Sequence, residues 1–335
     1  MTRTHLRLGS IFTAAALTAF LAGCATQPTA TPPTGQTPGI TKTKVGIVQF
    51  AEHPALDSVR KGFIDTLNEK GLTDKVTIDY KNAQGEMTTA QSIAQKMVGD
   101  KDDLILAIAT PAAQAVAKAT TTIPTLITAV TDPVSAGLAK SMEQPGGNIT
   151  GTTDMNPVAK QLELVKQLSP SAKKIGIPYN AGETNALVQV KIARQAASNL
   201  GLELVEVTVT NTNDVAQAVQ SLVGRVDALY IPSDNTVVSA FASVLKVAEK
   251  AKLPTICAGS DIVQQGGLAT WGIDYYQLGR QTGEMAIRII NGQKPAVMPI
   301  ESLKDVRLVI NKAAAEKIGL TIPTPLLQQA EVISK

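Results

Sequence analysis

Polar and aromatic residues follow several predicted strands of this 335-residue chain, where their side chains could bind a small polar molecule. Hydroxyls and amides donate and accept hydrogen bonds, carboxylates pair with cations, and aromatic rings stack on ligands. The carboxyl ends of parallel strands meet at one edge of a sheet, beside helix N-termini, so residues after different strands converge there. We expect ligand binding by Phe50, Glu52, His53, Thr110, Ala112, Thr131, Asp132, Tyr179, Asn180, Glu183, Asn185, Ser233, Asp234, Asn235, Ser260 and Asp261.

Several of these residues also suit a structural role. His53 precedes Pro54 and could simply position its loop. Glu52 and Glu183 stand out because neither position obviously requires a carboxylate. Helix capping explains four others as well as ligand binding does: Thr110, Asp132, Ser233 and Asp261.

Composition and motifs disfavour the common enzyme classes, metal sites and nucleic-acid binding. The chain has no GxxxxGK[ST], HExxH, GxSxG or strand-linked GxGxxG motif. Two Cys and two His leave little material for a metal centre, so we expect no metal and no cofactor. The only histidine outside the first 23 residues is His53, so a hydrolase would have to work through Glu52 and His53. The net charge of +3 is too small to indicate the basic surface that nucleic-acid binding requires, and we expect no nucleic-acid partner.

Short apolar runs alternate with amphipathic stretches along most of the chain. This alternation predicts parallel sheets covered by helices on both faces. We expect further strands and one helix in the tail, with the helix over residues 276–291. The first predicted strands are 44–50, 76–80, 103–109 and 124–130, and the helices between them include 55–70 and 87–98.

The apolar runs recur in the same order. KVGIVQF at 44–50 aligns with KIGIPYN at 174–180, and IPTLITA at 123–129 aligns with LPTICAG at 253–259, both at an offset of 130. DLILAIAT at 103–110 matches DALYIPSD at 227–234 at an offset of 124. The repeat predicts an α/β fold of two similar, doubly wound parallel-sheet lobes.

Three crossing strands are expected to join the lobes, at 150–154, 269–274 and 299–304. The gap between lobes that are linked in this way can close like a jaw. Two independent domains with a plain linker are the alternative. We assign 44–153 plus 274–299 to lobe 1 and 154–273 plus 300–335 to lobe 2.

The first 24 residues resemble the leader of a bacterial lipoprotein. Arg3 and Arg7 precede an apolar run of about 15 residues, shorter than the roughly 20 that span a membrane. Leu21-Ala22-Gly23-Cys24 is similar to a lipobox, which implies a signal peptide over 1–23, cleavage before Cys24 and lipid attachment to its sulfur. An uncleaved anchor or an ordinary signal peptide is the alternative.

The segment that follows is a predicted tether. Residues 24–43 are rich in Thr and Pro and cannot form a core. We therefore expect an extracytoplasmic body that the lipid anchors to a membrane. Cys257 lies in an apolar strand, where we expect a small buried side chain.

As a set, several segments resemble the tryptophan/tyrosine-type family of ABC-transporter substrate-binding lipoproteins, within the type I periplasmic binding proteins. They are GIVQFAEHPALDSVRKGF, ATPAAQAVA, TAVTDPVSAGL, GGNITGTTD, YNAGETNA, IPSDNT and YYQLGR. The resemblance implies a hinged two-lobe receptor that delivers a small solute, often an aromatic amino acid, to the transmembrane subunits of an ABC permease. It also leaves open a sensory binding protein of the same fold.

The residues support an amino acid as the ligand. Its carboxylate needs donors, which Thr110, Thr131 and backbone N–H groups near Ala112 could supply. The predicted loops contain no Arg or Lys, which argues against phosphate, and few aromatics, which argues against a sugar. Phe50 and Tyr179 are expected either to stack on the ligand or to pack between lobes. Carboxylates for the ammonium group could come from Glu52, Glu183, Asp132 or Asp234.

Overall fold

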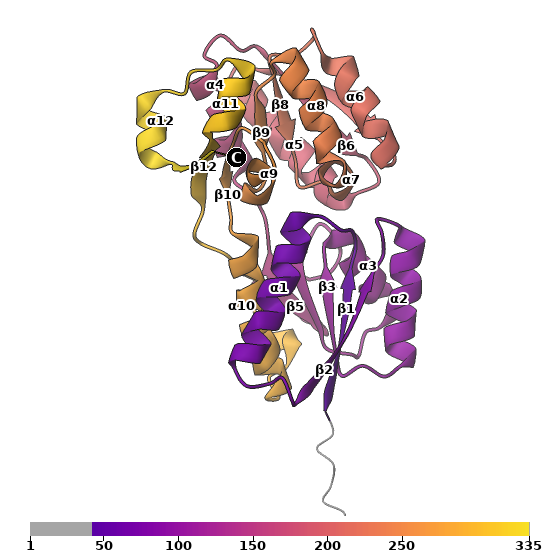
Figure 1. Cartoon of the computed structure of the whole chain (residues 1–335). Helices are drawn as coiled ribbons and strands as arrows, with labels where there is room; N and C mark the ends of the chain where they lie inside the picture. Colours follow the sequence, from indigo (N-terminus) through magenta and orange to yellow (C-terminus); the bar gives the residue numbers. More distant parts are fainter. Residues whose placement is uncertain (1–41, 335) are drawn as a thin grey trace, which may run out of the picture. The chain divides into compact units, whose positions relative to one another are not determined.

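The computed structural model describes residues 42–334, which form two sheets with the same strand order (Figure 1). The predicted leader, Cys24 and almost all of the tether lie outside the described residues. In the first sheet, β2 lies at one edge and β1, β3, β4 and β5 follow, all parallel. The strands of this sheet are β1 (Thr43–Gln49), β2 (Val76–Asn82), β3 (Leu104–Ile108), β4 (Thr125–Val130), β5 (Ile149–Thr153) and β11 (Glu301–Ser302).

The second sheet repeats this order, with β7 at its edge and β6, β8, β9 and β10 next. The strands that the repeat aligned hold the same positions, which confirms the predicted pair of similar lobes. Only the outer end differs, because β12 runs antiparallel to β10. The strands are β6 (Lys174–Asn180), β7 (Glu203–Val209), β8 (Ala228–Ile231), β9 (Thr255–Cys257), β10 (Ala269–Gly272), β12 (Arg307–Asn311) and β13 (Glu331–Ile333).

Helices cover both faces of each sheet and bury its apolar strands. In the first lobe, α1 and α10 pack together on one face, and α2 and α3 on the other (Figure 1). In the second lobe, α4 and α5 bury one core and α6 and α8 another. The buried Cys257 belongs to the latter, as its apolar strand predicted. The helices are α1 (Pro54–Glu69), α2 (Met87–Gly99), α3 (Thr110–Ala119), α4 (Val158–Leu168), α5 (Thr184–Asn199), α6 (Val215–Leu222), α7 (Asn235–Ser239), α8 (Phe241–Ala251), α9 (Ser260–Gln264), α10 (Tyr275–Ile290), α11 (Lys312–Ile318) and α12 (Thr324–Gln329), with 3₁₀ turns at Thr212–Asp214 and Pro295–Val297.

The structure corrects two details of the predicted crossings. β11 pairs with β5 in the first sheet, and Ile300 lies in the first core, so the chain returns to the second lobe after Ser302 and not after residue 299. The crossing from the second lobe back to the first was predicted at 269–274. It is shorter than this, because β10 is a member of the second sheet.

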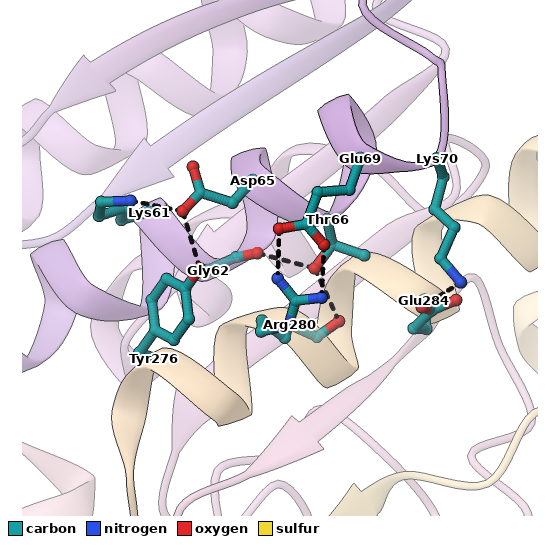
Figure 2. A network of polar contacts seen from close by, with 9 residues as sticks. All are labelled: Lys61, Gly62, Asp65, Thr66, Glu69, Lys70, Tyr276, Arg280 and Glu284. Atoms are coloured by element: carbon teal, nitrogen blue, oxygen red, sulfur yellow. Dashed lines mark hydrogen bonds and ion pairs between the residues drawn. The ribbon is translucent and has the colours of Figure 1, made fainter.

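The pairing of α1 with α10 attaches the chain that returns from the second lobe to the first. Figure 2 shows the polar contacts along this pair. Arg280 makes two hydrogen bonds to the Glu69 carboxylate, at 2.9 and 2.6 Å, and the Tyr276 hydroxyl donates to Asp65 at 2.8 Å. These groups are partly exposed to solvent, and ion pairs at a protein surface contribute about 0–1 kcal/mol each. The close approach of the two helices therefore depends chiefly on packing.

No helix among residues 42–334 is long and apolar enough to cross a membrane.

Candidate functional site

A cavity lies between the two lobes. Its walls come from the ends of β4, β5 and β8, the starts of α1, α5, α9 and α10, and helix α7. The lining residues are His53, Ala55, Leu56, Ala129, Thr131, Asp154, Asn185, Ser233, Asp234, Asn235, Val238, Ile262 and Tyr275.

Asp154 and Tyr275 form a buried pair in two of the crossing segments. Asp154 follows β5 and is 4% exposed, while Tyr275 begins α10 and is also 4% exposed. The Tyr275 hydroxyl donates to Asp154 Oδ2 at 2.8 Å, and Asp154 Oδ1 is buried with no hydrogen-bond partner. Burial raises the pKa of Asp154, and hydrogen bonds from the Tyr275 and Thr131 side chains only partly oppose this. A cationic group in the cavity would give this carboxylate the partner it lacks.

Two buried amides surround Ser233 on the opposite lobe. Asn156 donates from Nδ2 to Ser233 Oγ at 3.1 Å, and Asn185 donates from Nδ2 to the Ser233 carbonyl at 2.8 Å. In both amides the oxygen is buried and has no partner. Buried polar atoms are almost always hydrogen-bonded, so these acceptors point to a group that occupies the space between them.

His53 also presents an unpartnered atom at the cavity. Its Nε2 lies 3.3 Å from Asn235 Oδ1, and its Nδ1 is buried with no partner. Burial lowers the pKa of His53, which keeps the ring neutral near pH 7. The hydrogen bond between His53 and Asn235 joins the first lobe to the second.

Glu183, predicted as a ligand carboxylate, is instead enclosed by protein donors. Its Oε2 accepts from Asn185 and from both the backbone and the side chain of Asn235, at 2.6–3.0 Å. Its Oε1 accepts from the backbone and hydroxyl of Thr236 at 3.0 and 2.9 Å. Glu183 therefore positions the start of α7 and has no capacity left for a ligand ammonium group.

Asp234 lines the cavity but also has protein donors. Its two oxygens accept from the backbone N–H groups of Asn180 and Val237, at 2.6 and 2.9 Å. Burial and the neighbouring Glu183 raise the pKa of this carboxyl group. Asp234 thus caps α7, a structural role that had not been predicted for it from the sequence.

Three further predicted residues lie away from the cavity. Tyr179 packs in the second-lobe core, and its hydroxyl donates to Glu206 at 2.9 Å. Ala112 is fully buried in the first-lobe core. Asp132 accepts from Val134 and Ser135 and so stabilises its own turn, but no helix begins there for it to cap.

The remaining predicted residues are divided among other places between the lobes. Phe50, the exposed Glu52 and Asn180 line a second, polar cavity. Ser260 and Asp261 line a third, where Ser58 of α1 donates to Asp261 at 3.3 Å and burial raises the pKa of Asp261 to about 6. Thr110 begins α3, and its buried hydroxyl has no partner. Gln114, one turn further along α3, donates to Thr184 of α5 at 3.3 Å, so this end of α3 faces the second lobe.

Sequence reasoning missed Asp154, Asn156 and Tyr275. Asp154 follows a Thr-rich strand that lacks the apolar pattern of the others, although its segment was recognised as a crossing. The backbone also bends at the cavity, where the register of β4 and β5 shifts and Ala129 has a φ of 52°. Such irregularities occur next to binding sites more often than elsewhere, but nothing in the alanine's sequence context signals one.

Residues 44–333 match the family described as ABC transporter substrate binding protein. The chain belongs to this family. Its members are extracytoplasmic receptors that bind a solute for an ABC transporter, and the fold is that of the type I periplasmic binding proteins. The family resemblance, the two-lobe fold and the function that we predicted from the sequence are confirmed.

Relatives of this receptor are known in other bacteria. A tyrosine-binding protein of Clostridioides difficile is 46% identical over 278 residues, which cover 82% of this chain and 81% of the relative. A Streptococcus pneumoniae ABC domain in complex with L-Trp is 39% identical, with a TM-score of 0.85, over 88% of this chain and all of that one.

A third relative differs in its conformation. The ligand-free, open structure of a Clostridium difficile substrate binding protein with adhesive properties is 45% identical to the receptor, over 88% of this chain and 99% of that one, yet its TM-score is 0.66. The tryptophan-bound structure is less identical but superposes better. Together with the hydrogen bonds that His53, Ser58 and Gln114 make across the lobes, this contrast indicates a closed arrangement of the receptor.

Proposed function

We propose that this receptor binds an aromatic α-amino acid in the cavity between its lobes and delivers it to an ABC permease. The observation that carries the proposal is the set of unpartnered buried polar atoms at that cavity, contributed by both lobes. A ligand that satisfies groups on both lobes favours the closed form over the open one, which is the condition for ligand-driven closure.

The ammonium group is assigned to the acceptor oxygens. Asp154 Oδ1 supplies the negative charge, and Asn156 Oδ1 and Asn185 Oδ1 are further buried acceptors without protein donors. Asn156 and Asn185 both donate to Ser233. An ammonium group carries three N–H donors and no acceptor, so it suits a pocket in which the free atoms are acceptors.

The rest of the amino acid would meet other surfaces. Leu56, Val238 and Ile262 supply apolar side chains for a ring. Thr131 lines the cavity, and the Thr110 hydroxyl is a buried donor at the first turn of α3. We assign the carboxylate to these hydroxyls. The names of the relatives, one tyrosine-binding and one in complex with L-Trp, support the aromatic class.

The rival functions have less support. A hydrolase would require Glu52 and His53 to act together, but the two side chains line different cavities and His53 Nε2 faces Asn235. A sensory receptor would have the same binding site, so recovery of the permease in a complex with the ligand-bound protein separates transport from sensing.

A thermal-shift screen of the twenty amino acids tests the ligand class. Binding to the native state at about 100 times Kd adds about 2.7 kcal/mol, which for a protein of this size raises Tm by roughly 5–10 °C. We expect this shift with tyrosine or tryptophan and none with aspartate. If none of the twenty raises Tm, the amino-acid assignment is wrong although the family stands.

We also propose that Cys24 carries a lipid that anchors the receptor through the Thr/Pro-rich tether. Two or more acyl chains hold a protein firmly at a membrane. Cys24→Ser is expected to move the protein into the soluble fraction or to stall its processing, as fractionation and mass spectrometry of the intact chain would show. Cys257→Ser is the matched control, because that thiol is buried in β9, and it should leave the protein in the membrane fraction. A Cys24→Ser product that is processed and still membrane-bound contradicts the lipid anchor.

A further inference from the structure

We infer that His53 Nδ1 accepts a hydrogen bond from the side chain of the ligand, so that the receptor selects a phenol or an indole over an unsubstituted phenyl ring. This inference rests on the proposed function and names one residue that decides among aromatic amino acids.

The tautomer of His53 is set by Asn235. Asn235 Nδ2 donates to Glu183 Oε2 at 2.6 Å, so the amide is oriented with its oxygen toward His53. That oxygen lies 3.3 Å from His53 Nε2 and can only accept, so the ring proton is on Nε2. Glu183 holds this orientation because every one of its contacts is with a donor. The chain of contacts leaves Nδ1 as an acceptor.

Nδ1 has a lone pair and no donor among the residues that the structure describes. His53 is 8% exposed, so water does not readily replace the missing partner. A buried acceptor that stays unpaired costs about 1–3 kcal/mol, which a ligand with a suitable donor recovers.

Apolar side chains line the same cavity as His53. Leu56 lies one helical turn after His53 on α1, and Val238 lies one turn after Asn235 on α7, and both line the same cavity. Residues three apart on a helix share a face, so each apolar side chain flanks one partner of the His53–Asn235 hydrogen bond. The ammonium group, by contrast, has its acceptors around Asp154 and Ser233. A ring with one polar N–H or O–H can contact these apolar side chains and donate to His53 Nδ1.

The ligands differ in whether they leave His53 Nδ1 without a hydrogen bond. Tyrosine and tryptophan can donate to Nδ1, whereas phenylalanine fills the same space and leaves Nδ1 unpaired. Sites built around a hydrogen bond reject the analogue that lacks the donor, because the buried group is then left without a partner. One such bond corresponds to at least about a tenfold difference in Kd.

Calorimetric titration of the ligand-free receptor with L-tyrosine, L-tryptophan and L-phenylalanine tests the inference. The wild-type protein is expected to bind tyrosine or tryptophan at least about tenfold more tightly than phenylalanine. His53→Leu should weaken binding of the preferred ligand about tenfold and leave the binding of phenylalanine unchanged or tighter, so that the three Kd values converge. His53→Asn, which places an amide oxygen near the position of Nδ1, should retain the preference.

Three outcomes separate the possible failures. Equal binding of all three ligands by the wild-type protein overturns the role of His53 and leaves the aromatic class intact. An equal loss for all three in His53→Leu also overturns it, because His53 would then act on the shared part of the ligand. Absence of binding by all three overturns the proposed function itself.

Imidazole ¹⁵N spectra give a second readout that does not depend on the variants. His53 is the only histidine outside the first 23 residues, so the signals of the processed protein belong to it. In the tyrosine or tryptophan complex Nδ1 should be unprotonated and shifted by hydrogen bonding, and in the phenylalanine complex the shift should be absent. A proton on Nδ1 in either complex contradicts the inference.

Discussion

Asp154→Asn is expected to weaken binding of the aromatic amino acid about 100-fold. Asp154 is 4% exposed, and its Oδ1 has no hydrogen-bond partner among residues 42–334. Removing one partner of a buried, hydrogen-bonded charge pair costs about 2–5 kcal/mol, and 2.7 kcal/mol corresponds to a factor of 100 in Kd. Titration calorimetry at pH 7.5 measures the loss.

The same substitution should leave the ligand-free protein as stable as before, or raise its Tm. Burial raises the pKa of Asp154, so the charged carboxylate disfavours the folded state near neutral pH. Asparagine removes that charge and keeps an oxygen that can accept from the Tyr275 hydroxyl. A loss of binding with an unchanged or higher Tm identifies Asp154 as a ligand contact. A loss of binding together with a fall in Tm like that of a substitution in the core would make Asp154 structural.

Glu52→Gln is the matched control for this experiment. Glu52 is a carboxylate of the same lobe, but it is exposed and lines the second cavity. Its replacement should change Kd less than about twofold. An equal loss of affinity in both variants would contradict the assignment of the ammonium group to Asp154.

The pH dependence of binding follows from the same raised pKa. A carboxyl group with a raised pKa stabilises the ligand-free protein at low pH, and this contribution is lost as the pH rises through that pKa. A bound ammonium group favours the carboxylate, so binding releases a proton. Affinity should therefore fall as the pH drops below the pKa of Asp154, and this fall should be smaller in Asp154→Asn.

The lobes were predictable because their strands are nearly all apolar. Val45 to Val48 and Leu104 to Ile108 are buried throughout, and this pattern together with the repeat indicates parallel sheets. β5 escaped recognition as a sheet strand because its residues, Ile149–Thr153, are mostly threonine and glycine. Asp154 was missed together with β5, although it directly follows a strand end, where ligands usually bind.

The binding residues were only partly predictable, because the sequence does not show how deeply a side chain is buried or in which direction it points. Tyr179 lies near the end of the first strand of its lobe and His53 follows the first strand of the other lobe, yet Tyr179 packs in a core and His53 lines the cavity. Glu183 was expected to bind the ligand. Its partners Asn235 and Thr236 come from α7, more than 50 residues away, and only the folded chain brings their donors to it.

Packing between α1 and α10 is the feature that the sequence suggests least and on which the first lobe depends most. Gly279 and Gly283 lie four residues apart on α10 and face α1. A Cβ atom at Gly279 would overlap the backbone carbonyl of Val59, and one at Gly62 would overlap that of Tyr276. The overlapping atoms belong to backbone, so no side-chain rotation can relieve them. The exposed ion pairs of Figure 2 cannot hold the helices at this distance alone.

Gly279→Ala is therefore expected to lower the free energy of unfolding by about 2–4 kcal/mol and Tm by roughly 5–12 °C. Alanine has the higher intrinsic helix propensity, so the loss must come from the forced separation of α1 and α10. Gly99→Ala, at the end of α2, has no atom within 4 Å of the added carbon and should change the unfolding free energy by less than about 1 kcal/mol. Thermal denaturation followed by circular dichroism measures both. Equal Tm values for the two variants would mean that the helices separate without cost and that the glycines do not hold α10 against the first lobe.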